Sequence, residues 1–556
     1  MTVWKKAPFP DGNYSLKVQK VFPVPILLRN FVLDFRESED AVMENVRRHF
    51  SLKGDEIKDF RIIRKALDAR KKSSIKFVYT IEFVLDDEKA FLERFATDPD
   101  LQLVPARPKP SFPRFASDRK IIIAGMGPAG LFAAIRLSEY GLTATLVERG
   151  KPVEERLKDV QSFWRGGTLD TESNVQFGEG GAGTFSDGKL TARTKDRNLG
   201  YVLEKLVQFG APREILYLSK PHIGTDRLRR VVQEIRKNLE TLGFEICFRR
   251  KLTDLLCRDE RLAEVVLNGC EVRPCDFLVL APGHSARDTY EMLLRRMVRM
   301  EQKPFAVGLR VEHPQGLIDR IQYGVSDRQQ LPSAEYALAY SCPGTNRSVY
   351  SFCMCPGGVV VAGASEPGML VTNGMSNFLR DSSYANSALV VPVGGKDFTG
   401  ESPLAGMEFQ RIWERRAFLA GGGDYYAPVQ KLTAFLGIRG TNGISATYRP
   451  GVREAILDEV LPDYVLETIR DGIHQFNRKM RGFITEEATL TGIETRTSAP
   501  VRIVRGEDLQ SVNMRGLYPA GEGAGYAGGI MSAALDGIRV ADGIAMRIME
   551  GKRSIF

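Results

Sequence analysis

The chain has 556 residues, too many for one hydrophobic core, so two to four domains are expected. Hydrophobic residues make up 43% and charged residues 26%, which excludes a largely disordered chain. The net charge of +9 is compatible with a phosphate-bearing cofactor, an acidic substrate or RNA, although a solvated surface with spare lysines explains it more simply.

The sequence shows no sign of export or membrane insertion. No apolar run reaches the roughly 18 residues that a membrane span needs. The first residues lack the apolar core of a signal peptide. Seven cysteines, an odd number spread over the chain, do not make a secreted disulfide framework. We therefore expect a cytoplasmic protein without a membrane span.

Residues 1–104 predict a separate N-terminal module. Its expected elements are strands at 30–35, 60–64, 75–84 and 101–104 and helices at 40–50 and 88–95. The order strand, helix, strand, strand, helix, strand favours a ferredoxin-like fold. Four prolines in residues 105–117 indicate a stiff linker after this module.

A dinucleotide-binding pattern begins at residue 120. An apolar strand, residues 121–124, leads into residues 125–130, Gly-Met-Gly-Pro-Ala-Gly, which fit G-x-G-x-x-G and open a helix. Gly125 would make the tight turn, Gly127 would let the backbone approach a pyrophosphate, and Gly130 would allow close packing of helix on strand. Pro128 and Ala129 open the helix, and the free N–H groups of this helix start, from Ala129 onward, would face the phosphates.

The next strand, residues 143–148, ends in Glu148, and Arg149 follows it as a further candidate for cofactor binding. A carboxylate at this position can accept hydrogen bonds from the ribose hydroxyls of adenosine, and it repels a 2′-phosphate. A glycine turn that binds nothing is the alternative, but it does not explain the complete strand, turn, helix, strand and acid.

Residues 517–530, Leu-Tyr-Pro-Ala-Gly-Glu-Gly-Ala-Gly-Tyr-Ala-Gly-Gly-Ile, precede a helix from about residue 531 to 550. This segment resembles the C-terminal flavin motif of flavoproteins with two dinucleotide-binding domains. The resemblance implies FAD as the cofactor. It also implies that Glu522, after Gly521 and in place of the family's aspartate, contacts the ribitol chain. The helix that follows Gly528, Gly529 and Ile530 would point its N-terminus at the flavin pyrimidine ring.

Two further segments resemble loops that these flavoproteins place near the cofactor. They are residues 178–189 and the strand end at 280–283, which contribute Gly180, Gly181, Gly183, Ser186, Ala281 and Gly283. Over residues 118–556 the chain looks like the bacterial and plastid group described as FAD-dependent dehydrogenases. More distantly, it is similar to flavoproteins that modify RNA bases and to saturating polyprenyl reductases.

These observations predict an α/β protein with a Rossmann-like, doubly wound FAD-binding sheet, a mixed α+β substrate lobe and the small α+β N-terminal module. The FAD-binding domain would comprise residues 118–299 and a C-terminal return at 485–556, with the substrate lobe at 300–484 between them. A second G-x-G-x-x-G in strand–helix context is missing, so the reductant would be a transient NADH or NADPH, a redox protein or the substrate itself. Five histidines and no C-x-x-C pair predict no metal site.

Four residues are candidates for chemistry beyond cofactor binding. His284, directly after Gly283, could protonate a substrate or bind a flavin phosphate, or be a structural loop residue. Tyr526 could stack, donate a proton, or simply pack. Arg496 and Arg502 could clamp an anionic substrate in a bidentate manner, or belong to a charged edge strand.

Cys353 and Cys355 form a C-x-C pair in an expected strand. On a regular strand their Cα atoms lie about 6.6 Å apart with parallel Cβ vectors. A disulfide needs Cβ atoms about 3.5–4.5 Å apart. We therefore expect free thiols that pack one face of the strand. A redox-active dithiol is the alternative, and it requires the chain to bend.

The sequence therefore predicts an FAD-dependent oxidoreductase that transfers hydride between the flavin and a small, anionic organic substrate. An RNA-binding flavoprotein acting on bases is one alternative, but acidic and basic residues balance each other in residues 51–100. A scaffold that binds FAD without turnover is another.

Overall fold

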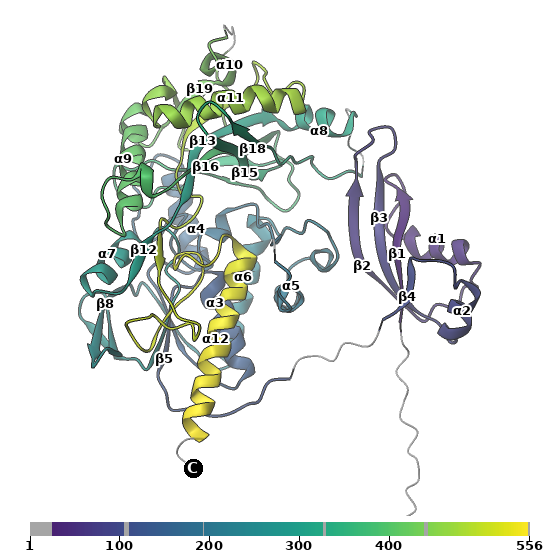
Figure 1. Cartoon of the computed structure of the whole chain (residues 1–556), viewed down its shortest axis with the longest axis horizontal. Helices are drawn as coiled ribbons and strands as arrows, with labels where there is room; N and C mark the ends of the chain where they lie inside the picture. The colour runs from purple at the N-terminus through teal and green to yellow at the C-terminus, as the bar shows by residue number, and fades with distance from the viewer. Residues whose placement is uncertain are drawn as a thin grey trace, which may run out of the picture. The chain divides into compact units, whose positions relative to one another are not determined.

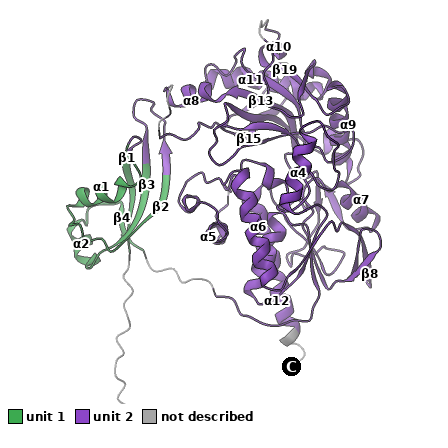
Figure 2. Cartoon of the chain, turned by 180° about the vertical axis from the view of Figure 1, so that it is seen from behind, with its two compact units in different colours: residues 1–33, 37–65, 78–110 green, residues 34–36, 66–77, 111–556 purple. Residues whose placement is uncertain are grey.

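The computed structural model describes residues 25–104, 111–192, 194–325, 328, 330–438 and 443–553. Two compact units are distinguished, residues 1–33, 37–65 and 78–110 as one and residues 34–36, 66–77 and 111–556 as the other (Figure 2). Residues 105–110 of the expected linker lie outside the described residues, and residues 111–117 form neither helix nor strand. Within the described residues, no helix is long and apolar enough to cross a bilayer.

The N-terminal elements form one four-stranded sheet of order β2-β3-β1-β4 with two helices. They are β1 (Ile26–Asp34), α1 (Ala41–Phe50), β2 (Asp59–Asp68), β3 (Lys76–Val84), α2 (Glu88–Arg94) and β4 (Leu101–Leu103). Every second residue of β3 is buried, and Val42, Val46 and Phe50 form the buried side of α1. This alternation fits a sheet with one face covered by helices.

The dinucleotide pattern lies in a parallel five-stranded sheet of order β23-β11-β5-β6-β7. Its strands are β5 (Ile121–Ala124), β6 (Thr145–Glu148), β7 (Glu245–Phe248), β11 (Phe277–Leu280) and β23 (Leu517–Pro519). All four residues of β5 are buried, because both faces of the sheet are covered.

The two faces of this sheet are covered differently. Helices α3 (Pro128–Glu139), α5 (Leu199–Gln208), α6 (Thr225–Thr241) and α12 (Ile530–Arg553) pack on one face (Figure 1). The other face carries α7 (Arg287–Arg295) and an antiparallel sheet of β8 (Leu252–Arg258), β9 (Arg261–Leu267) and β10 (Glu271–Pro274). The second face is therefore covered by one helix and an antiparallel sheet, and not by helices alone.

A second, seven-stranded sheet has the order β14-β15-β18-β13-β21-β19-β20. Its strands are β13 (Phe305–Pro314), β14 (Ala339–Cys342), β15 (Arg347–Cys355), β18 (Tyr384–Val393), β19 (Ala427–Lys431), β20 (Val452–Glu454) and β21 (Thr489–Glu494). The helices α8 (Gln315–Tyr323), α9 (Ala405–Ala420), α10 (Leu432–Phe435) and α11 (Asp463–Lys479) share its hydrophobic core (Figure 1). The hairpin of β16 (Val359–Ala362) and β17 (Thr372–Met375) forms a separate pair.

The chain returns to the parallel sheet later than expected. Strand β21 still belongs to the seven-stranded sheet, so the return begins after Glu494 and not near residue 485. The crossing is made by β12 (Met300–Gln302) and β22 (Val501–Ile503), which pair in antiparallel fashion. The remaining elements are α4 (Val153–Phe163) and four short 3-10 turns at Ala182–Phe185, Arg213–Leu216, Gly395–Asp397 and Leu457–Glu459.

Candidate functional site

A cavity opens at the carboxyl ends of β5, β6 and β11, where the chain also enters α3 and α12. It extends to the second sheet, of which β15 and β21 line it, and to β17 of the β16–β17 hairpin. Its empty space, including the part open to solvent, is about 1620 Å³. The wall contains most of the residues expected from the sequence: Gly125, Gly127, Pro128, Ala129, Glu148, Arg149, Gly181, Gly183, Ser186, Ala281, Gly283, His284, Arg496, Glu522, Gly528, Gly529 and Ile530.

The three fingerprint glycines have three different surroundings. Gly125 has φ of 103°, and a Cβ there would lie 2.1 Å from the carbonyl oxygen of Ala281. A Cβ on Gly130 would lie 2.0 Å from the Gly125 carbonyl oxygen, so Gly130 packs helix against turn behind the wall. A Cβ on Gly127 meets no atom closer than the Gly181 Cα at 3.9 Å. Gly127 therefore leaves its backbone open to the cavity, as close approach of a pyrophosphate requires.

Two helix N-termini lie in the cavity wall. Gly127 is the N-cap of α3, and no side chain caps this end. Helix α12 begins at Ile530, and a Cβ on Gly528 or Gly529 would meet no atom within 4 Å. Unoccupied N–H groups and the helix dipole make such ends suited to phosphate and to negative charge on a flavin. This geometry fits a flavin dinucleotide.

The carboxylate of Glu148 holds three loops together. It accepts backbone N–H bonds from Met126 at 2.9 Å, Gly150 at 2.9 Å and Gly178 at 3.0 Å. A carboxylate offers about four acceptor positions, so one remains for a ribose hydroxyl. The same side chain therefore shapes the cavity and can still contact a ligand.

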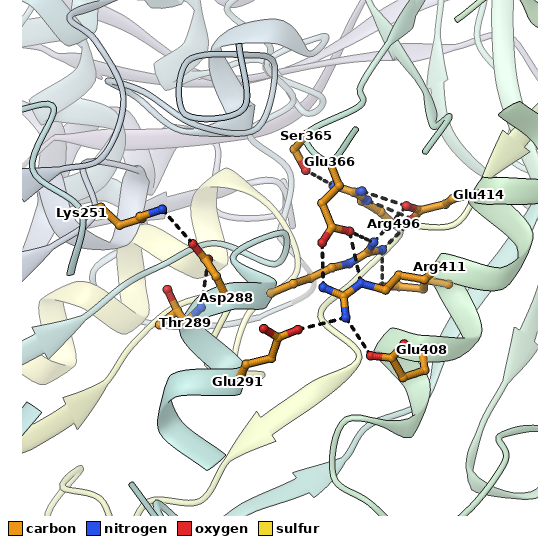
Figure 3. Close-up of polar contacts among 12 residues, drawn as sticks. Lys251, Asp288, Thr289, Glu291, Ser365, Glu366, Glu408, Arg411, Glu414 and Arg496 are labelled. Atoms are coloured by element: carbon orange, nitrogen blue, oxygen red, sulfur yellow. Dashed lines mark hydrogen bonds and ion pairs between the residues drawn. The ribbon is translucent and has the colours of Figure 1, made fainter. Parts of the chain in front are cut away.

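The Arg149 side chain is committed to neighbouring carboxylates. Its two terminal nitrogens donate to the Asp288 oxygens at 2.8 and 2.7 Å, and Nε donates to Glu172 at 2.7 Å. Lys251 joins the same group, since it bonds Glu172 at 2.8 Å. It also lies 3.4 Å from Asp288 (Figure 3). These carboxylates raise the pKa of Arg149 above its usual range. Arg149 is thus part of the cavity wall, and its guanidinium donors are used by Asp288 and Glu172 and not left for a phosphate.

Two of the expected glycines act behind the wall. A Cβ on Gly180 would lie 2.3 Å from Thr184 Cγ2, and a Cβ on Gly521 would lie 2.7 Å from the Cβ of Ala129. The Gly521 N–H donates to Asp536 at 2.8 Å. Both glycines therefore shape turns, and neither lines the cavity.

The sequence analysis missed Arg156, which organises the glycine-rich loop. This side chain on α4 is fully buried and donates to the carbonyl oxygens of Asn174, Val175, Gly178, Glu179 and Gly181 and to the Thr184 hydroxyl. Burial lowers the pKa of Arg156 to about 9. One arginine in an amphipathic helix carries no sequence pattern that distinguishes it from a surface residue.

His284 lies in the wall as expected, but its chemistry differs from the acid role considered for it. Burial, together with the positive charges of Arg496 and Arg287, lowers the pKa of His284 to about 3. Its Nδ1 lies 3.0 Å from the Ser285 hydroxyl. A ring that is neutral at physiological pH can donate or accept one hydrogen bond, but it has no imidazolium proton to give.

Arg496 cannot clamp a substrate with its guanidinium fork. Nε and Nη2 donate to the two Glu414 oxygens at 3.1 and 2.9 Å, and Nη1 donates to Ser365 at 2.6 Å. Arg287 donates to the same carboxylate, from Nη2 to Oε1 of Glu414 at 2.7 Å. Around this core, Glu366 and Arg411 extend the network, and Arg411 also bonds Glu291 and Glu408 (Figure 3). The clamp predicted for Arg496 is therefore wrong, although its charge remains in the wall.

Two candidates, Tyr526 and Arg502, do not line the cavity. The Tyr526 hydroxyl donates to the Ile503 carbonyl and accepts from the Arg505 N–H, both at 3.0 Å. Its ring packs under the Arg505 guanidinium, 3.7 Å from the ring centroid. Arg502 is exposed, with its guanidinium carbon 5.6 Å from the same centroid. A substrate role for either residue has no support from this placement.

Glu522 is the titratable group at the α12 end of the cavity. Burial raises the pKa of Glu522 to about 7, against the opposing effects of Lys303 and of the Gly529 N–H. At neutral pH this carboxyl is therefore present in both protonation states. A group with such a pKa can exchange a proton with a bound ligand.

The wall on the second sheet was also missed. Phe352 and Glu494 line it, beside Asn373 of the β16–β17 hairpin, and the Glu494 carboxylate accepts from Arg310 Nη2 at 2.9 Å and Nε at 3.1 Å. These residues come from three strands that are distant in sequence, so only the tertiary fold brings them together.

Strand β15 is irregular at the two cysteines. Its pairing with β18 slips between Phe352 and Cys355, and Cys353 has φ of 44°. The thiols are free, but the regular strand on which this expectation rested is not present. Within the described residues, no group of three or more histidine, cysteine or acidic side chains could hold a metal ion.

Two segments of the chain match known domain families, and the chain as a whole resembles a bacterial protein. Residues 304–497 match the family described as FAD-dependent protein, C-terminal domain-like, and residues 26–84 match a domain of unknown function (DUF8436). An uncharacterized protein of Clostridium beijerinckii is 47% identical over 525 residues, which cover 93% of this chain and 98% of that protein.

Solved structures resemble the chain only weakly. The flavin-dependent brominase Bmp2 matches at 13% identity and a TM-score of 0.35, over 78% of this chain and 79% of its own. The halogenase PltM in complex with phloroglucinol and FAD matches at 11% identity and a TM-score of 0.35, over 79% and 71%. Superpositions this weak carry no argument about activity. The domain match and the clostridial relative are informative: the chain belongs to the family of that clostridial protein and is FAD-dependent, with FAD as its cofactor.

Proposed function

We propose that this FAD-dependent protein is an oxidoreductase, a dehydrogenase that transfers hydride between the flavin and a small, anionic organic substrate. The observation that carries the proposal is the continuity of the cavity. Gly127 and the start of α12 share one wall with Phe352 and Glu494 of the second sheet. A cofactor bound along the glycine side would therefore face a compartment lined by protein, where a substrate can be held away from water.

The cofactor roles follow from the groups that each part of the wall presents. The open backbone at Gly127 and the α3 N-terminus would receive the pyrophosphate, and Glu148 would receive the ribose. Glu522 would contact the ribitol chain, and the start of α12 would face the pyrimidine ring. When bound, FAD supplies two-electron chemistry, and the protein supplies position, charge and proton exchange.

An anionic substrate is supported by the charges around the compartment. Lys189 lines the cavity and uses one of its three N–H donors on the Met354 carbonyl. The nearby arginines do not add to this charge, because Arg496 and Arg287 both bond Glu414 and Arg287 also bonds Glu366. A substrate carboxylate or phosphate would therefore be attracted by Lys189. Glu522 would hold or release the proton that accompanies hydride transfer.

The test begins with the purified protein and the cofactor it releases on denaturation, for which we expect FAD and not FMN. Anaerobic titration with NADH and with NADPH then shows whether a transient nicotinamide bleaches the visible absorption of the flavin. A redox protein is the alternative donor, so dithionite-reduced protein is used for the second stage.

In that second stage, the reduced protein is mixed anaerobically with unsaturated carboxylic acids and with their uncharged esters. We expect reoxidation by an acid at least tenfold faster than by its ester. Protein that no member of such a panel reoxidises, although its FAD is reducible, would contradict the dehydrogenase proposal and favour a scaffold. Equal rates with acid and ester would contradict the preference for an anionic substrate and leave the dehydrogenase proposal standing.

A further inference from the structure

The strand that carries Cys353 and Cys355 contains a bulge. Phe352 pairs with Ala388 of β18, and Cys355 pairs with Asn386, so three steps along β15 match two along β18. Cys353 adopts a left-handed backbone with φ of 44°, which L residues other than glycine rarely show. Strained backbone of this kind is concentrated at functional sites.

The bulge turns the Cys355 side chain back toward Cys353. Cys355 Sγ lies 3.3 Å from the Cys353 carbonyl oxygen, to which the thiol donates. A regular strand would hold the same two side chains parallel and apart.

The environments of the two thiols differ. Cys353 is partly exposed and lines the FAD cavity, whereas Cys355 is fully buried behind it. Such a pair has the arrangement of an accessible attacking thiol and a resolving thiol.

The charges around the pair favour a thiolate at Cys353. The Arg310 guanidinium lies 3.3 Å from the Cys353 carbonyl, and Lys189 bonds the carbonyl of Met354. The neighbouring Cys355 thiol and these two cations lower the pKa of Cys353 to about 6, against the opposing effects of burial and of the Glu494 charge. Other carboxylates facing the pair are Glu522 for Cys353 and Asp187 for Cys355, and the pKa of Cys355 is raised.

We propose that Cys353 and Cys355 form a thiol–disulfide exchange site in the wall of the FAD cavity, with a small disulfide as its substrate. The Cys353 thiolate attacks one sulfur of that disulfide, forms a mixed disulfide and releases the other half as a thiolate. Cys355 then gives its proton to the released thiolate and attacks the Cys353 sulfur, which expels the second half. One small disulfide is reduced to two thiols while two protein thiols become one disulfide, so atoms and electrons balance.

The test uses the full chain with its FAD and 5,5′-dithiobis(2-nitrobenzoate) as the small disulfide. The exposed Cys257 and Cys270 are replaced by serine in every variant so that they do not react. In this background we expect the tryptic peptide of residues 348–380 to lose two hydrogens, which marks an internal Cys353–Cys355 disulfide. Cys355→Ser should instead trap a mixed disulfide on Cys353.

Removing the attacking thiol should have the largest effect. In Cys353→Ser we expect modification of this peptide to slow by at least about 100-fold. Cys342→Ser is the matched control, because Cys342 is buried and does not line the cavity, and it should leave the internal disulfide unchanged. A stable mixed disulfide in the chain with both cysteines, or modification of Cys353→Ser at the original rate, would overturn the proposal.

A second readout needs no substitution at the pair. The rate at which iodoacetamide labels Cys353 should reach half its maximum near pH 6, and a midpoint near the ordinary thiol value of about 9 would contradict a thiolate site. Both readouts are peptide masses, so they are obtained whether or not FAD is reduced by any donor. Failure of the dehydrogenase proposal and failure of the dithiol site are therefore distinguishable.

Discussion

The guanidinium of Arg496 is locked onto the carboxylate of Glu414, with Nη2 2.9 Å from Oε2 and Nε 3.1 Å from Oε1. Glu414 is fully buried, and Arg287 bonds it from the other side. Because removing one member of a buried ion network leaves the others without a partner, the loss is far greater than for a surface pair. The arginine in the cavity wall is thus fixed in position by a residue outside it.

Glu414→Gln should lower the free energy of unfolding by about 3–5 kcal/mol. The two arginines lower the pKa of Glu414 to about 2 from an ordinary value of 4.5. The carboxylate's contribution is therefore complete above about pH 4.5 and is lost as the pH falls toward 2. Urea unfolding across this range should show the loss in the parent protein and not in Glu414→Gln.

The matched control is Glu408→Gln on the same helix. Glu408 also pairs with an arginine, but its side chain is 57% exposed, so we expect a change below about 1 kcal/mol. Equal destabilisation by the two substitutions would contradict the assigned role of the buried network.

Arg156→Lys should weaken FAD binding by at least about 100-fold while keeping the positive charge. Lysine offers three donors from one atom and cannot reach the carbonyl groups on both sides of the loop that the planar guanidinium spans. Fluorescence titration of the apoprotein with FAD measures the loss. Arg249→Lys, at an exposed ion pair with Glu155, is the control and should leave the affinity unchanged.

Gly127→Ala and Gly125→Ala should fail in different ways. Gly127→Ala should fold normally and bind FAD more weakly, because its methyl group would enter only the cavity. Gly125→Ala should destabilise the protein itself, since its φ is 103° and its Cβ would overlap the Ala281 carbonyl. Thermal unfolding without FAD and FAD titration separate the two effects.

For the glycine series, Gly200→Ala provides the reference. Gly200 lies in α5 with nothing within 4 Å of an added Cβ, so we expect neutral or slightly higher stability. Wild-type FAD affinity in Gly127→Ala would contradict the pyrophosphate assignment.

Residues 1–104 should fold as a separate polypeptide. Their sheet has its own core, in which Phe50 contacts Phe91 and Phe95 with ring centroids 5.2 and 5.0 Å apart. Circular dichroism and cooperative thermal unfolding of the isolated segment measure this. In the full chain, limited proteolysis should cut first between residues 105 and 117. First cuts elsewhere would show that the boundary is misplaced.

The sequence predicted those parts of the fold that depend on local patterns. The apolar run at Ile121–Ala124 and the glycines after it identify a parallel strand and its turn, because steric needs there allow few alternatives. The sequence did not predict that β8, β9 and β10 cover the second face of this sheet. Short strands show the same alternation of apolar and polar residues in any antiparallel sheet, so the pattern does not indicate where they pack.

The candidate site was predictable on its glycine side and not on its second-sheet side. The glycines are required where the backbone comes close to a ligand or to another segment of the chain, and a local sequence motif indicates such positions. Arg496 and Tyr526 bond partners that lie 21 to 131 positions away in the sequence, and the surroundings of Cys353 depend on a one-residue bulge. A strand pattern indicates neither. These are the positions at which the sequence-based roles had to be revised.

Strand β11 can pair with its neighbour β23 only late in translation. Leu278 of β11 pairs with Leu517, and α12, which packs against α3, follows that strand. At translation rates of about 5–20 residues per second, the edge of β11 waits roughly 10–50 s for its neighbour. During this interval a nascent chain displays a finished glycine turn beside an unpaired strand edge, which is prone to wrong pairing. Chains released early would therefore carry the complete fingerprint and still be substrates for chaperones and proteases.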